Sequence, residues 1–153
     1  MDPSPDEVAG VVDLFGALTA AEIERAFTDI AARQGTSIDQ NRLRDLIETA
    51  EAEYYLVRLE DGEPDRYVPG PAALPTLPEH GEDLPHMMDV EPVTIDRSTI
   101  GRAVEERLRA DAASAVADED IDRMTTLLDV AYEVDAWGVD TSEIRDRLSA
   151  AMG

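Results

Sequence analysis

The chain has 153 residues, and its 35 acidic against 13 basic residues give a formal charge of −22 at pH 7. All 13 basic residues are arginine, and the sequence contains no lysine and no cysteine. This charge argues against a nucleic-acid coat protein or a binder of anionic membranes, because both need basic surface to meet phosphate. The lack of cysteine excludes disulfides, thiolate catalysis, zinc ribbons and iron–sulfur clusters.

The carboxylate excess also predicts the solvent in which the chain folds. Repulsion among the carboxylates is weak only where salt screens it, so we expect an extremely halophilic cytoplasm. A genomic bias toward arginine codons would explain the missing lysine but not the excess of acids. Hydrophobic residues make up 43% of the chain and recur periodically, which predicts a folded protein. The sequence has no membrane-length apolar stretch and no basic start of a signal peptide, which favours a cytoplasmic localisation.

Capping signals divide the start of the chain into helices. Ser4 and Glu7 form a capping box before apolar residues at helical spacing, and Thr19 with Glu22 repeats the signal. A third helix is expected from about Asp39, with apolar residues at the same spacing. These signals predict three short helices in succession.

The pattern then changes from the period of a helix to that of a strand. Residues 55–59 form a β-like run, 60–63 an acidic turn and 66–68 a possible return strand. Three short helices followed by a β-hairpin is the order of a winged helix-turn-helix domain. We therefore expect a winged-helix-like N-terminal domain over residues 1–70, although a generic α+β domain can produce the same order.

Six prolines interrupt residues 69–92 and exclude a helix there. Leucines precede three of them, which favours an extended strap laid over a domain surface; a loosely ordered linker is the alternative. We expect a mainly α protein in three parts, with the winged-helix-like domain followed by a proline-rich strap at 71–93 and a C-terminal helical region at 94–153.

The C-terminal region carries apolar stripes typical of three helices. In the middle helix the stripe includes Ile121, Leu128 and Tyr132, which we expect to face the core together with their apolar neighbours. Asp140 and Glu143 predict a capping box for the last helix.

A winged-helix domain would place its third helix, residues 40–53, in the major groove of DNA. That helix holds Arg42 and Arg44 against four carboxylates, and the turn at 60–63 is acidic as well. Both elements would repel phosphate, so direct DNA binding is disfavoured. If it occurred, the DNA contacts would be Arg42, Arg44 and Arg58.

One window of the sequence is locally positive. Residues 97–110 hold four arginines against two glutamates, a net charge of +2. Such a window is a candidate docking patch for an acidic partner or a phosphate backbone. The alternative is that the arginine stems flank the apolar stripe and pair with carboxylates of the chain. The patch would consist of Arg97, Arg102, Arg107 and Arg109.

Signals for catalysis or metal binding are weak. The sequence contains no P-loop, no G-x-G-x-x-G, no G-x-S-x-G and no H-E-x-x-H motif. His80 and His86 lie among carboxylates, but their spacing of six matches no helix-based metal motif. We therefore expect no catalytic residue, no cofactor and no metal, with a small hydrolase or metal-dependent enzyme as a distant alternative.

Short runs along most of the chain share one resemblance. They are VVDLFGALT at 11–19, VPGP at 68–71, DLPH at 83–86 and LLDV at 127–130, together with Trp137. These runs look like those of a family of uncharacterised haloarchaeal proteins, a resemblance that implies an organism class but no mechanism. More loosely, the first half resembles winged-helix regulators, without the basic residues that DNA-binding members carry in the third helix and wing.

Taken together, these features favour a non-catalytic protein-interaction or regulatory accessory module, with a protein partner or self-association and without a membrane. The alternative is a winged-helix transcriptional regulator that contacts DNA.

Overall fold

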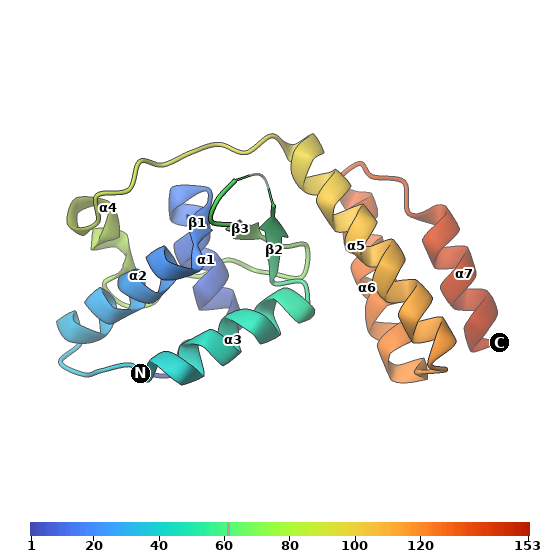
Figure 1. The fold of residues 1–153 in the computed structure, drawn as a ribbon, viewed down its shortest axis with the longest axis horizontal. Helices are drawn as coiled ribbons and strands as arrows, with labels where there is room; N and C mark the ends of the chain where they lie inside the picture. The colour runs from blue at the N-terminus through green and yellow to red at the C-terminus, as the bar shows by residue number, and fades with distance from the viewer. Residues whose placement is uncertain (61) are drawn as a thin grey trace. The chain divides into compact units, whose positions relative to one another are not determined.

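The computed structural model describes residues 1–60 and 62–153, so Asp61 in the predicted acidic turn lies outside the described residues. The chain divides into two compact units, unit 1 at Met1–Ile95 and unit 2 at Asp96–Gly153 (Figure 1). The prediction of a mainly α protein is confirmed, with helices and a small sheet in the N-terminal half and helices alone in unit 2. None of the helices in the described part of the chain is long and apolar enough to cross a membrane.

Unit 1 combines helices with a three-stranded antiparallel sheet in the order β1-β3-β2. Its helices are α1 (Pro5–Phe15), α2 (Ala20–Arg33), α3 (Gln40–Ala52) and α4 (Leu84–Met87), with a 3-10 turn at Gly81–Asp83. Its strands are β1 (Leu18–Thr19), β2 (Leu56–Leu59) and β3 (Arg66–Pro69). The three helices and the β2–β3 hairpin match the prediction, whereas β1 was not predicted. It is two residues long and pairs with β3, where Leu18 lies opposite Tyr67.

Local hydrogen bonds start the first three helices where the sequence indicates. The Ser4 hydroxyl accepts from the Glu7 backbone N–H at 3.1 Å, and the Glu7 carboxylate accepts from the Ser4 N–H at 2.9 Å. Thr19 and Glu22 form the same reciprocal pair at the start of α2. The Asp39 carboxylate accepts two backbone N–H groups at the start of α3. These bonds satisfy donors that a helix N-terminus otherwise leaves unpaired.

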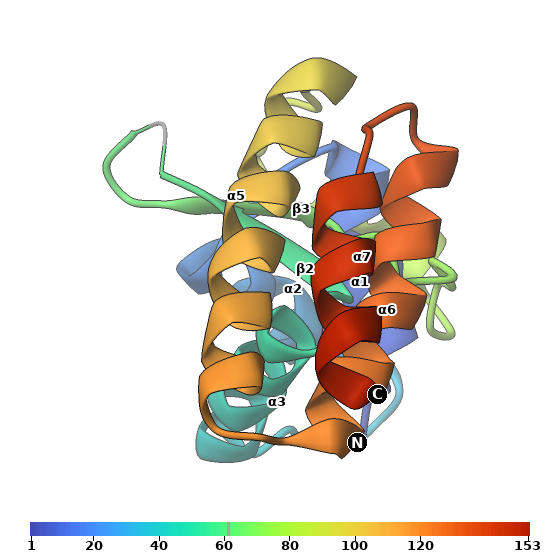
Figure 2. The same cartoon turned by 90° about the vertical axis from the view of Figure 1, so that its right-hand side faces the viewer.

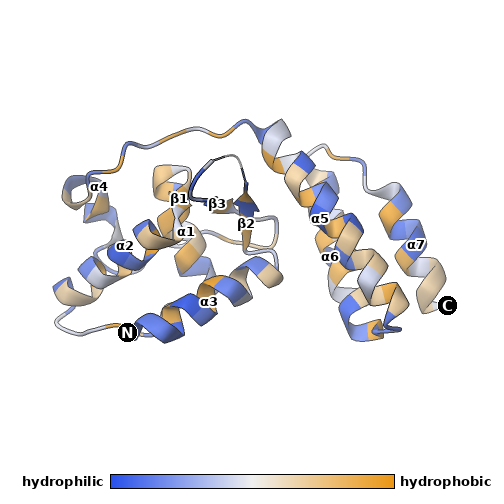
Figure 3. Ribbon diagram, in the orientation of Figure 1, coloured by the Kyte–Doolittle hydropathy of each residue, from blue (hydrophilic) through white to orange (hydrophobic). Residues whose placement is uncertain are grey.

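Helix α1 lies at the centre of the core of unit 1. Six of its eleven residues are buried, and it is the most uniformly apolar of the three long helices of the unit, whereas α3 carries polar residues over much of its length (Figure 3). Side chains from α2, α3 and the sheet pack around it. The fully buried ones include Leu18, Phe27, Ile30, Leu43 and Leu56.

The proline-rich segment packs along α1. The backbone N–H of Leu74 donates to the Asp6 carboxylate at 2.9 Å, and that of Thr76 donates to the Asp6 carbonyl at 3.1 Å. At the other end of α1, the Val93 N–H donates to the Phe15 carbonyl at 2.8 Å. Between these anchors, α4 contributes Leu84 to the core, where it is completely buried. The segment is therefore an integral part of unit 1.

A glycine within α1 permits this close packing. A Cβ atom added at Gly10 would overlap the backbone of Thr76 where the segment crosses the helix. Glycine inside a helix lowers stability by roughly 0.5–1 kcal/mol relative to alanine. At position 10 the close approach of Thr76 explains why glycine is present despite this cost.

Unit 2 consists of α5 (Arg97–Ala117), α6 (Ile121–Ala136) and α7 (Ser142–Met152), each in contact with the other two. Figure 2 shows the three helices side by side. Their inward faces are apolar, and the completely buried side chains include Val104, Leu108, Leu127, Val134 and Leu148.

A buried threonine joins α6 to α7. The Thr141 hydroxyl donates to the Ala131 carbonyl at 3.0 Å, and its backbone N–H donates to the Asp135 carboxylate at 2.9 Å. Arg145 completes the junction with an ion pair to Asp135 at 2.8 Å. The predicted capping box at this helix start is wrong, because the N-cap residue is Thr141 and its side chain makes no capping bond. Asp140 instead accepts from the backbone and hydroxyl of Ser142.

The glycine in α1 gives a test of how the proline-rich segment is packed. Gly10→Ala gains helix propensity but drives a Cβ into backbone, so we expect unit 1 to lose about 1–3 kcal/mol of unfolding free energy. Gly101→Ala in α5 is the matched control, because its Cβ would meet only a Val139 methyl at 2.8 Å, which can move. Denaturant unfolding in concentrated KCl, followed by circular dichroism, measures the unfolding free energies of both variants. A Gly10→Ala protein as stable as the wild type would contradict the observed crossing.

Candidate functional site

Helix α3 is the element that a winged-helix protein would present to DNA. It buries Leu43, Ile47 and Ala50 against the rest of unit 1, which leaves its opposite side in solvent. That side exposes two carboxylates and two neutral polar side chains, namely Asn41, Asp45, Glu48 and Thr49. The side of α3 opposite its buried residues is therefore acidic, and the exposed Arg42 and Arg44 lie on either flank of that side.

The two arginines of α3 are each paired with a carboxylate from another segment. Arg42 lies 3.4 Å from Asp2 in the N-terminal segment, and the Nε atom of Arg44 donates to Glu24 of α2 at 2.7 Å. The hydrogen bond that Arg44 donates to Glu24 raises the pKa of the Arg44 guanidinium, and the charge of the same carboxylate adds to this shift. Both arginines thus connect α3 to its neighbours instead of forming a shared cationic surface.

Arg58 on β2 is engaged in the same way. Its Nε atom donates to Glu51 at 3.2 Å, and its Nη1 atom lies 3.9 Å from Asp65. Its guanidinium also lies 5.8 Å from the centre of the Tyr67 ring. The hydrogen bond to Glu51 raises the pKa of Arg58, while burial raises the pKa of Tyr67 against the lowering effect of the nearby Arg58 charge. All three predicted DNA contacts therefore have a carboxylate within 4 Å.

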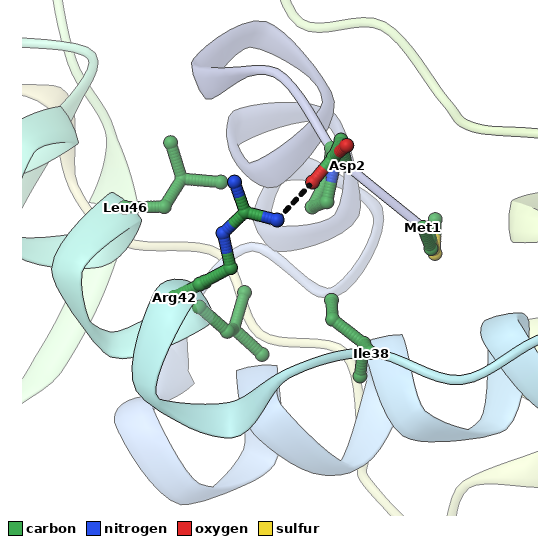
Figure 4. Close-up of a pocket in the computed structure, with 7 residues that line it drawn as sticks. Met1, Asp2, Ile38, Arg42 and Leu46 are labelled. Atoms are coloured by element: carbon green, nitrogen blue, oxygen red, sulfur yellow. Dashed lines mark hydrogen bonds and ion pairs between the residues drawn. The ribbon is translucent and has the colours of Figure 1, made fainter.

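A small hollow lies beside Arg42 (Figure 4). Its volume is about 180 Å³, and the Arg42–Asp2 ion pair forms part of its lining. The remaining lining residues are apolar and are Met1, Pro3, Ile38, Leu43 and Leu46. Sites for small molecules are usually clefts of about 300–1,000 Å³, so we assign no ligand to this hollow.

Three of the four arginines of the predicted α5 patch have separate neighbours. Arg97 lies over the ring of Trp137 at 4.7 Å, and Arg107 lies 3.5 Å from Asp111. Arg109 has two carboxylate neighbours in unit 2, Glu105 at 3.1 Å and Glu143 at 3.4 Å, and the hydrogen bond to Glu105 is the main cause of its raised pKa. Arg102 is exposed on the same helix.

The histidines do not belong to a metal-binding cluster. In the described part of the chain, no group of three or more histidine or acidic side chains is placed to hold a metal ion. His80 lies 3.8 Å from Glu79 and 4.0 Å from Asp83, whereas His86 is exposed on α4.

The surface that sequence reasoning missed is on α6. Ile121 and Tyr132 were expected in the core, but they expose 49% and 55% of their surface, and Leu128 between them is half-buried. The apolar stripe of α6 is wider than one helix face, and its other half supplies the buried Met124, Leu127 and Val134. The extra width of this apolar stripe is the feature of the sequence that could have indicated an exposed apolar surface on α6.

Comparisons with known proteins give a family and no function. A family model described as "Family of unknown function (DUF7109)" matches residues 6–153, nearly the whole chain. Neither the curated proteins nor the solved structures that were compared include a match. The chain therefore belongs to the DUF7109 family.

Proposed function

We propose that this protein is a non-catalytic interaction or regulatory accessory module that acts through contact with another protein in a halophilic cell. The observation that carries the proposal is the exposure of Ile121 and Tyr132 on α6, in a unit whose inner faces are well packed. Burial of apolar surface is the dominant favourable contribution to most protein association, and apolar and aromatic side chains of this kind form the centres of protein interfaces.

The charge of the exposed surfaces supports the same conclusion. A nucleic-acid site needs guanidinium or ammonium groups that can approach phosphate. On α3 and the hairpin, the arginines at the required positions are held by Asp2, Glu24 and Glu51. Breaking those ion pairs would add to the repulsion that phosphate meets from the exposed acids of α3.

Recovery of the protein from its own cells tests this function. We expect the chain, when it is purified in about 3 M KCl, to co-elute with a second protein. Once this partner is identified, it should form a complex again with the purified chain. The measurement is light-scattering mass, compared with 16.7 kDa for the single chain. An unrelated acidic protein of similar size and charge, carried through the same purification, controls for non-specific capture. Recovery of the chain alone as a monomer would overturn the proposal.

The second candidate is a DNA-binding regulator. It is favoured by the order of elements in unit 1, because helices α1 to α3 followed by a hairpin, with β1 at the edge of β3, resemble the arrangement of winged-helix domains. In that case Arg42, Arg44 and Arg58 would exchange their carboxylate partners for phosphate.

A charge-reversal experiment separates the two candidates. We expect labelled genomic DNA fragments in about 2 M KCl to show no saturable rise in fluorescence anisotropy with the wild-type protein. Nor should Arg42→Glu with Arg44→Glu change the signal. Arg25→Glu with Arg147→Glu, at two exposed positions on α2 and α7, makes the same change in net charge. Saturable binding that only the α3 pair abolishes would establish the DNA-binding candidate instead.

A further inference from the structure

Helix α6 carries a second apolar row in addition to its core-facing side. Its members are spaced four, three and four residues apart, so they fall within a sector of about 60° on the helix surface. With a rise of 1.5 Å per residue, the row extends for roughly 16 Å, or three turns. The row consists of the apolar residues Ile121, Leu128 and Tyr132 and of the polar Thr125, whose hydroxyl donates to the Ile121 carbonyl at 3.0 Å.

One side of this row is bordered by α7, which lies beside α6 in Figure 2. The Thr125 hydroxyl lies 3.7 Å from the Met152 sulfur, so the half-buried Met152 extends the apolar surface at one end. At the other end, the Arg145 guanidinium lies 4.9 Å from the centre of the Tyr132 ring. Arg145 is itself held by Asp135, so the exposed tyrosine ring has a fixed support.

The other side of the row is bordered by carboxylates. Asp122, Asp129 and Glu133 are exposed and follow the same helix about 100° around from the apolar row. They are spaced seven and four residues apart, which places them in a line parallel to the row. The surface therefore combines an apolar strip with a negative edge on one side.

We propose that the α6 row docks an amphipathic helix of the partner protein, with apolar side chains on Ile121, Leu128 and Tyr132 and arginine or lysine facing the carboxylate edge. This inference rests on the proposed protein-interaction function and names the surface and the chemistry of the partner. A helix presents apolar residues at spacings of three and four, which is the spacing of the row.

Charge decides between this partner and a second copy of the chain. In an antiparallel symmetric pair of α6 rows, the negative edges of both copies would lie on the same side and near one another, and like charges across an interface are unfavourable. A basic flank on the partner removes that repulsion and adds attraction to Asp122, Asp129 and Glu133. The row therefore fits a basic amphipathic helix better than it fits itself.

Synthetic peptides test the assignment on the full chain. The probe is a labelled helical peptide of about 16 residues with leucines at spacings of four, three and four and arginines along one flank. Two further peptides carry glutamates on the flank, or serines in place of the leucines. In about 0.5 M KCl, where close charge pairs within an interface are screened less than distant surface charges, we expect the arginine-flanked peptide to bind at least tenfold more tightly than either control peptide, measured by fluorescence anisotropy.

Variants of the chain locate the binding. Ile121→Ser with Tyr132→Ser should weaken the arginine-flanked peptide at least tenfold, whereas Leu74→Ser, at a residue 77% exposed in unit 1, should leave it unchanged. Asp122→Arg, Asp129→Arg and Glu133→Arg together should transfer the preference to the glutamate-flanked peptide. Circular dichroism checks that each variant remains helical.

Four results would overturn the assignment. One is equal binding of the arginine-flanked and glutamate-flanked peptides by the wild type. Another is a wild-type dimer that Ile121→Ser with Tyr132→Ser converts to a monomer, which would make a second copy the occupant. The third is a partner from the purification experiment that the serine variant still retains, in which case the interaction function stands and only the α6 row is wrong. A chain that is monomeric, partnerless and indifferent to all peptides removes both proposals.

Discussion

Excess negative charge constrains how this chain uses its 13 arginines. At least eight of them lie within 4.0 Å of a carboxylate, and several of these pairs join separate elements. Arg44 ties α3 to α2, Arg58 ties the hairpin to the end of α3, and Arg145 ties α7 to the loop end of α6. An exposed pair of this kind contributes about 0–1 kcal/mol, so the greater consequence is functional. A guanidinium group that is paired within the fold has to give up a carboxylate before it can bind phosphate.

Because the arginines are paired in this way, we place the candidate binding surface on α6 and not on α3, which is the helix that a winged-helix protein would use. On α3, the exposed acids and the paired arginines leave little to attract DNA. In the complex that we propose on α6, attraction comes from apolar area, which does not depend on a surplus of cations. The carboxylates of Asp122, Asp129 and Glu133 border the apolar row and in that complex would favour a basic partner over an acidic one.

The parts of the fold that were predictable from sequence depend on local interactions. The capping boxes at Ser4 and Thr19 involve residues three apart, and both form as expected. Strand β1 could not be predicted, because two residues carry no period and Leu18 finds its partner Tyr67 far along the chain. At α7 the N-cap is Thr141, one residue beyond the expected Asp140, and the Thr141 hydroxyl bonds to the Ala131 carbonyl of α6 instead of capping the helix.

The candidate surfaces were harder to predict for the same reason. Arginines on α3 and α5 are visible in the sequence, but their partners are 20 residues away for Arg44 and 34 for one partner of Arg109. Because carboxylates are frequent throughout the chain, the spacing of residues in the sequence does not identify which carboxylate pairs with a given arginine. The α6 row was assigned to the core because periodicity indicates apolar sectors without showing which sector the neighbouring helices cover.

The most direct test of the charge constraint is the dependence of stability on salt. At 0.1 M ionic strength the Debye length is about 10 Å, so repulsion among surface carboxylates persists, whereas above 1 M it falls below about 3 Å. Urea unfolding of the full chain, followed by circular dichroism in about 0.1 M and about 3 M KCl, measures the effect. If the net charge of −22 governs this fold, the unfolding midpoint rises substantially with KCl. Cooperative unfolding at the same midpoint in both solutions would contradict the account.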